Sequence, residues 1–252
     1  MKNIILILIL LLSGLGFSQN EQLFEEANKL YNEGQYHEAL DKYSTILESG
    51  NHSAELYFNM GNSHYKLNNI APSIYYFEKA LLLEPNDKEI SNNIAFARNM
   101  TIDSIEKVPD VGLSSLINKW AKYFHYETWA KISVTLSILF VLLFVFYLFS
   151  NASSSKRFAF ISSTVSLILV LATLGLTFHG KALVDENQPA IVFAKESQIK
   201  NEPNLRSSEA FKLHEGTKVQ VLDTVDNWKK VKIADGKTGW VMSEDIKLIK
   251  NF

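Results

Sequence analysis

The sequence predicts a multidomain membrane protein with an all-α region of helical repeats, a two-helix transmembrane hairpin and a small all-β barrel. Three observations predict this order: an apolar pattern that recurs after 34 residues, two long uncharged apolar blocks, and a change to period two after residue 190. The predicted segments are a signal peptide at 1–18, repeats with a capping helix at 19–100, a linker and amphipathic juxtamembrane helix at 101–131, the hairpin at 132–178 (spans 132–149 and 158–178) and the β-rich domain at 179–252.

The first 18 residues have the layout of a secretory signal peptide. Lys2 precedes the nine-residue apolar run 4–12, and small residues lead to Ser18, so that cleavage leaves a mature chain starting at Gln19. The alternative is an uncleaved anchor, although nine apolar residues are fewer than the roughly 20 that a span needs. The chain contains no Cys, which excludes a lipidated Cys, thiol chemistry and Cys-ligated metal.

Residues 20–100 contain two copies of a two-helix motif and one further helix at the same phase. In YFNMGNSHYKLNNIAPSIYYFEKALLLEPND, Gly61 stands where two helices would cross and Pro85 ends the second helix; Ala27 and Asn51 occupy these places in the first copy. The motif resembles the tetratricopeptide repeat, although Ser73 stands where Ala is usual. The resemblance rests on Tyr57, Met60, Gly61, Tyr65, Ile70, Ile74, Phe77, Ala80, Leu81 and Pro85.

The resemblance implies a concave groove formed by the first helix of each copy. In peptide-binding domains of this family, Asn side chains on this face can hydrogen-bond the ligand backbone. The alternative is that the aromatic side chains only pack between repeats and the Asn side chains are solvated. The predicted groove residues are Phe24, Asn28, Tyr31, Phe58, Asn62, Tyr65, Asn92, Phe96 and Asn99.

The stretch LSSLINKWAKYFHYETW predicts one amphipathic helix beside the membrane. Leu113, Leu116, Ile117, Trp120 and Phe124 fall on one helical face. The aromatic residues of this stretch fit an interfacial belt. The alternative is that the same face packs on the repeat domain.

Two blocks of 18 and 21 uncharged residues predict the transmembrane hairpin. The connection SNASSSKR is predicted to be too short to fold and carries Lys156 and Arg157, so it is expected in the cytoplasm. Both soluble domains would then be periplasmic, at the bacterial inner membrane. Four lysines flank the spans on the outer side and do not support this orientation: Lys119, Lys122, Lys131 and Lys181. The predicted orientation therefore depends on the export signal.

The region after residue 190 has short strand-like runs such as KVQVLDTV, WKKVKI and TGWVM. A predicted hairpin turn at Asp235-Gly236 separates two of them. With Trp228 and Gly239-Trp240, these features resemble a bacterial SH3 domain, whose members are often associated with cell-wall or peptide ligands. We take Trp228 and Trp240 as the candidate SH3-like surface; the alternative is that the barrel itself needs them.

No catalytic motif is complete in the sequence. Gly236-Lys237-Thr238 lacks the earlier Gly of a phosphate loop because Val231 stands there, and His214-Glu215 lacks the second His of a zinc protease because Lys218 replaces it. The six His show no ligand spacing. The sequence therefore predicts a protein that is not an enzyme, with no cofactor and no metal.

The charge distribution is uneven. Residues 19–110 hold 15 acidic and seven basic side chains, an excess of eight negative charges. This argues against nucleic acid and favours basic segments of partner proteins.

The order of export signal, tetratricopeptide repeats, membrane hairpin and SH3-like barrel resembles the Bacteroides aerotolerance (Bat) protein family, specifically its E member. This resemblance implies encoded neighbours that include a MoxR-type AAA+ ATPase, and a role in stress tolerance. The expected partners are membrane proteins with von Willebrand factor A domains and other Bat proteins, and peptidoglycan is a possible ligand. The expected function is a non-enzymatic inner-membrane scaffold for envelope proteins. The alternative is an anchor or sensor whose SH3-like barrel binds peptidoglycan.

Overall fold

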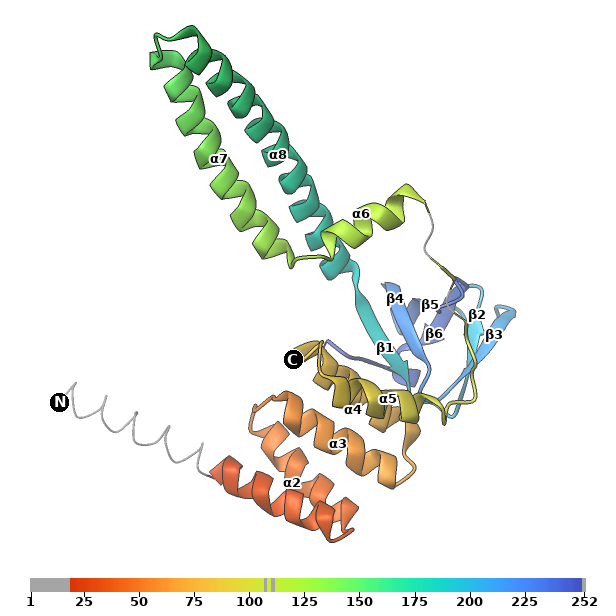
Figure 1. Cartoon of the computed structure of the whole chain (residues 1–252). Coiled ribbons are helices and arrows are strands. Elements are labelled where there is room, and N and C mark those ends of the chain that lie inside the picture. The colour runs from red at the N-terminus through yellow and green to blue at the C-terminus, as the bar shows by residue number, and fades with distance from the viewer. Residues whose placement is uncertain (1–18, 107, 110–111, 251–252) are drawn as a thin grey trace, which may run out of the picture. The chain divides into compact units, whose positions relative to one another are not determined.

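The structure is a computed structural model that describes residues 19–106, 108–109 and 112–250 (Figure 1). The predicted signal peptide lies outside the described residues. The chain divides into two compact units, one that combines residues 1–107 with 188–252 and one that spans 108–187. The predicted fold class is confirmed, because a helical-repeat region, two apolar helices and an antiparallel β domain follow in this order.

Five helices form the repeat region: a helix over residues 19–32, α2 (Tyr36–Glu48), α3 (Ala54–Lys66), α4 (Ile70–Leu83) and α5 (Lys88–Arg98). Two of them begin at side-chain caps. The Ser53 hydroxyl accepts a hydrogen bond from the backbone of Leu56, and the Asp87 carboxylate accepts two, from Glu89 and Ile90. Pro85, two residues past the end of α4, prevents that helix from continuing.

The helices pack around small residues and aromatic rings. A Cβ atom at Gly61 would lie 2.7 Å from the ring of Phe77, so only Gly permits this approach of α3 and α4. Ala27 and Tyr43 of the first copy form one core with Met60 of α3. The second core is continuous with the β domain, as described below.

The β domain contains seven antiparallel strands in the order β3-β2-β6-β5-β4-β1-β7. Its core is formed by alternate aliphatic side chains, including Val192, Ile199 and Val241. The predicted turn lies in the connection between β5 and β6, where Gly236 has φ +92°. The strands are β1 (Gln188–Val192), β2 (Glu196–Lys200), β3 (Glu209–His214), β4 (Lys218–Val225), β5 (Trp228–Lys232), β6 (Thr238–Met242) and β7 (Ile246–Leu248), with the short 3-10 helix η1 (Ser243–Asp245) before β7.

The repeats and the β domain share one hydrophobic core within their unit. Ile191 and Ile249, both fully buried, belong to the same cluster as Ile74 of α4. Phe193 meets Tyr75 edge to face, with ring centroids 5.5 Å apart. The β domain therefore covers one face of α4, and the two domains form one packed body.

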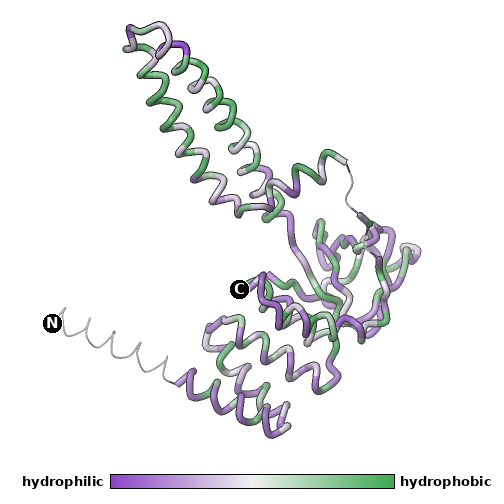
Figure 2. The backbone as a smooth tube through the Cα atoms, in the orientation of Figure 1, coloured by the Kyte–Doolittle hydropathy of each residue, from purple (hydrophilic) through white to green (hydrophobic). Residues whose placement is uncertain are grey.

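The second unit contains α6 (Leu113–Ala121), α7 (Tyr126–Phe149) and α8 (Ser153–Glu186). By length and composition, α7 and α8 are each long and apolar enough to cross a membrane, and Figure 2 colours most of both as hydrophobic. Small buried residues on α8, such as Ser163 and Ser166, face α7, and the Ser166 hydroxyl donates to the Leu136 carbonyl at 3.0 Å.

Three element boundaries differ from the sequence prediction. The predicted helix over 113–129 is two helices, separated at 122–125, where the backbone of His125 is extended (ψ 145°) and cannot continue a helix. The rings of Phe124 and Trp129 pack edge to face at this break. Only residues 150–152 connect the apolar helices, since α8 already begins at Ser153. Residues 179–186 extend α8 instead of opening the β domain, although only Lys181, Ala182, Leu183 and Glu186 among them are strong helix formers.

Candidate functional site

A groove of about 540 Å³ follows the inner face of the repeats. Its lining comes from the helix over 19–32, α3 and α5, with contributions from the second helices of both copies. The lining residues are Asn28, Tyr31, Asn32, Tyr43, Phe58, Asn59, Asn62, Tyr65, Lys66, Phe77, Glu89, Asn93 and Phe96.

Six of the nine predicted groove residues line this groove: Asn28, Tyr31, Phe58, Asn62, Tyr65 and Phe96. The other three, Phe24, Asn92 and Asn99, are not part of the lining. Phe24 packs on Tyr43, with ring centroids 5.8 Å apart, which matches the alternative of packing within a repeat. Asn92 and Asn99 are exposed elsewhere on and after α5.

Two equivalent amide pairs connect neighbouring first helices. Asn59 Nδ2 donates to Asn28 Oδ1 at 2.9 Å, and Asn93 Nδ2 donates to Asn62 Oδ1 at 2.9 Å. The Tyr43 hydroxyl also donates to Asn28 Oδ1, at 2.6 Å. These bonds engage the acceptor oxygens of Asn28 and Asn62. Their Nδ2 groups make no hydrogen bond within the described part of the chain, so both amides can offer N–H donors to a ligand.

Tyr43 is a stable donor in this network. Burial raises its pKa to about 12, and the neighbouring Asn59 opposes the rise. The hydroxyl therefore keeps its proton across the physiological range. This proton fixes the orientation of the Asn28 amide.

Asn59 and Asn93 are groove residues that were not predicted from the sequence. They stand 34 residues apart, so both occupy the same position of the repeat, and this spacing is visible in the sequence. Their role could not be predicted because it depends on contacts between helices. The same holds for Lys66 and Glu89, the two charged residues of the lining.

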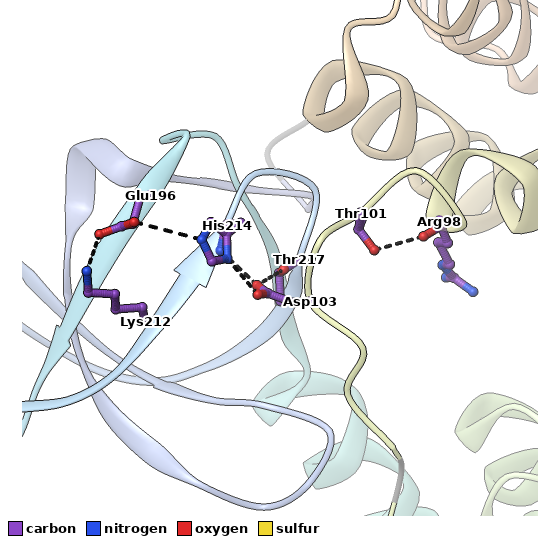
Figure 3. Close-up of polar contacts among 7 residues, drawn as sticks. All are labelled: Arg98, Thr101, Asp103, Glu196, Lys212, His214 and Thr217. Atoms are coloured by element: carbon purple, nitrogen blue, oxygen red, sulfur yellow. Dashed lines mark hydrogen bonds and ion pairs between the residues drawn. The ribbon is translucent and has the colours of Figure 1, made fainter.

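The junction between the repeats and the β domain carries a second polar cluster (Figure 3). Asp103 accepts three hydrogen bonds of 2.6 to 2.7 Å, from the backbone and ring nitrogens of His214 and from the Thr217 hydroxyl. Buried Glu78 pairs with Arg98 at 2.6 Å and with Lys218 at 2.7 Å. Burial acts to raise the pKa of Asp103, but the hydrogen bonds from Thr217 and His214 together outweigh it, so that this pKa is lowered. These contacts connect the linker and α4 to the β domain.

Trp228 and Trp240 lie on one face of adjacent strands. Trp228 is opposite Met242, and Trp240 is opposite Lys230, so the two indoles are diagonal neighbours. Both are partly buried. Lys200 of β2 pairs with Trp240 on its other side, which gives this face an aromatic and basic character.

The described residues contain no group of three or more His, Cys, Asp or Glu side chains that could hold a metal ion.

Two family models match parts of the chain. Residues 54–87 match the tetratricopeptide repeat, and residues 198–247 match the bacterial SH3 domain. No curated protein matches the chain. The chain thus combines two kinds of interaction module, which suggest binding of proteins or of cell wall.

Proposed function

We propose that this chain is a non-enzymatic scaffold of the bacterial inner membrane whose repeat groove captures extended segments of envelope proteins. The observation that carries the proposal is the pair of groove amides, Asn28 and Asn62, whose oxygens are engaged inside the protein. Their N–H groups suit the carbonyl oxygens of a peptide backbone. Aromatic side chains beside them, Tyr31 and Tyr65, provide apolar contact at the same interval.

The proposed location and partners rest on the order of the segments along the chain. The two apolar helices support membrane association, and the predicted export signal supports a periplasmic position for both soluble domains. The partners we propose are membrane proteins with von Willebrand factor A domains and other Bat proteins, in a complex for aerotolerance or stress tolerance. The excess of acidic residues in the repeat region also favours partners with basic segments.

In-cell crosslinking of the full chain, followed by membrane purification and mass spectrometry, tests this function. The double variant Asn28→Ala with Asn62→Ala removes both groove donors and should reduce partner recovery at least about tenfold. The matched control is Asn92→Ala with Asn99→Ala, which changes two exposed Asn outside the lining. Equal recovery from all three proteins, or equal loss in both variants, would contradict capture through the groove.

A second candidate function is a cell-wall anchor or sensor acting through the β domain. It is favoured by the face that holds Trp228 and Trp240 next to Lys230. The full chain in detergent micelles should then sediment with isolated peptidoglycan, and Trp240→Ala should weaken this binding. Peptidoglycan binding that survives Trp240→Ala would exclude this face as the site.

A further inference from the structure

The apolar face of α6 is widely exposed and has no part in the proposed function. Leu113, Leu116 and Trp120 are 73%, 57% and 62% exposed, and Tyr123 and Phe124, which follow the helix, are 72% and 41% exposed. An exposed patch of several large apolar side chains usually marks a surface that binds a protein, a ligand or a membrane. We therefore expect this face to have an occupant.

A different side of α6 is attached to the hairpin. His179 Nε2 of α8 donates a hydrogen bond to Asn118 Oδ1 at 2.7 Å. Ala121 is buried, and a Cβ atom at Gly180 would lie 3.6 Å from the Ala121 carbonyl oxygen, so α6 passes close to α8 at this point. Asn118 and Ala121 stand three residues apart and share one side of the helix. These contacts fix the rotation of α6 against α8 and leave its apolar face exposed.

The attachment lies at the end of the apolar block of α8. The uncharged stretch of that helix ends at Phe178, and the next two residues make the contacts with α6. Because a helix rises about 1.5 Å per residue, these contacts lie within about 3 Å of the end of the block. Figure 1 shows α6 beside this end of α8, running across the hairpin instead of continuing it. Where α7 and α8 cross a membrane, α6 therefore lies at the level where the hydrocarbon core meets the headgroups.

The charged side chains around α6 are mainly basic. Residues 113–131 contain Lys119, Lys122 and Lys131 but only one acidic residue, Glu127. All three lysines are exposed, and within the described part of the chain their ammonium groups form no salt bridge or hydrogen bond. Anionic lipid headgroups carry the opposite charge at this level, and each basic residue near them strengthens membrane binding. A bilayer surface therefore complements both the apolar and the basic side chains of this segment.

We infer that α6 is an interfacial helix on the membrane that α7 and α8 cross. Its apolar face lies among the ends of the acyl chains next to the headgroups, and Lys119 and Lys122 bind the phosphates of anionic lipids. This inference goes beyond the proposed function and requires only that α7 and α8 span the membrane. It holds for either orientation of the hairpin, so it gives the lysines on the outer flanks a role that is separate from topology.

Site-directed spin labelling of the full chain in lipid vesicles tests the position of α6. A nitroxide is attached through Leu116→Cys on the apolar face, in a chain that has no natural Cys. Oxygen concentrates in lipid and a nickel chelate stays in water, so the collision rates with the two reagents report where the label lies. We expect the label at 116 to collide mainly with oxygen. A label at Ser114, which is exposed and lies off the apolar face, should collide mainly with the chelate.

Leu142→Cys is the control for insertion of the hairpin. Leu142 lies within α7 and is 63% exposed, so its label should also collide mainly with oxygen. With this control satisfied, a label at 116 that collides mainly with the chelate would overturn the inference. A label at 116 that is shielded from both reagents would overturn it as well, because the face would then be packed on protein, such as the repeat domain.

Spin-labelled lipids test the preference for anionic headgroups. In phosphatidylcholine vesicles, the full chain should retain labelled phosphatidylglycerol in preference to labelled phosphatidylcholine, and Lys119→Gln with Lys122→Gln should lower this preference at least about twofold. The matched control, Lys195→Gln with Lys232→Gln, makes the same change in charge at two exposed positions of the other unit and should leave the preference unchanged. Equal preference in all three proteins, or equal loss in both variants, would overturn the assignment of anionic lipids to α6. Neither experiment measures partner recovery, so failure of this inference would leave the scaffold function standing.

Discussion

At the scale of single residues, Gly61 sets how closely α3 can approach α4. A Cβ atom there would lie 2.7 Å from Cδ1 of Phe77, whose ring is buried and cannot swing away without disturbing the core. We expect Gly61→Ala to destabilise the protein by about 1–3 kcal/mol. Urea unfolding followed by circular dichroism measures this. Gly175→Ala in α8 is the control, because nothing lies within 4 Å of that Cβ and Ala favours a helix over Gly, so this change should not destabilise the protein.

Lys79 is a buried cation whose Nζ lies 4.8 Å from the ring centroid of Tyr57 and 5.3 Å from that of Tyr75. Burial lowers its pKa to about 8. Between pH 8 and its unfolded pKa of 10.5, the folded chain binds fewer protons than the unfolded chain, so Lys79 makes stability rise with pH in this window. Above pH 10 the raised pKa values of Tyr43 and Tyr57, each about 12, act in the opposite direction.

The variant Lys79→Met isolates this effect. It should be more stable than the wild type at pH 7, by roughly 1–3 kcal/mol, because the charged form is the one that burial penalises. The advantage should shrink between pH 8 and pH 10. The test is to measure the unfolding midpoints of both proteins across that pH range. If the difference in stability between Lys79→Met and the wild type does not change with pH, the higher stability of the variant comes from packing instead.

At the scale of elements, the sequence predicted whether a segment forms a helix or a strand better than it predicted where that element begins and ends. The period-two runs after residue 190 did become strands, because alternate side chains such as Val219 and Val221 enter one core. The start of the domain was missed, because residues 179–186 continue α8, and the local sequence, which includes Gly180, does not mark where that helix ends. In the groove, Asn28 and Asn62 follow from the repeat phase alone, whereas the partners that orient them require helix contacts that no local pattern encodes.

The linker segment from Thr101 to Glu106 gives an element-scale prediction. Its Asp103 carboxylate binds His214 and Thr217 of the β domain, and Ile105 packs on that domain's core. Asp103→Asn keeps the shape but cannot accept all three hydrogen bonds as a carboxylate does, so we expect a loss of about 1–3 kcal/mol at pH 7.

The pH dependence separates this effect from a packing change. Because the pKa of Asp103 is lowered in the folded state, its contribution is present above the unfolded pKa of 3.8 and is lost as the pH falls through the folded pKa. The difference in unfolding midpoint between wild type and Asp103→Asn should therefore decrease on acidification. Glu106→Gln, at an exposed carboxylate three residues further on, is the control and should leave the stability at pH 7 unchanged.

At the scale of the whole molecule, the repeats and the β domain are adjacent in space although residues 108–187 separate them in sequence. Ile191 and Ile249 contribute to the core of the second repeat, and Glu78 of α4 pairs with Lys218 of β4. Both domains must then lie on the same side of any membrane that α7 and α8 cross. This requirement is independent of the export signal and holds for a hairpin that enters and leaves on one side.

Single-cysteine labelling tests this arrangement, since the natural chain contains no Cys. Cysteines replace three exposed residues, Lys88 in α5, Ser154 at the start of α8 and Ser208 before β3. A membrane-impermeant maleimide applied to intact cells with a permeable outer membrane should label positions 88 and 208, and should label position 154 only after lysis. Labelling of 88 and 208 from opposite sides would contradict the shared core itself. Labelling of 154 alone in intact cells would keep the shared core and invert the proposed periplasmic orientation, because the two domains would then lie together in the cytoplasm.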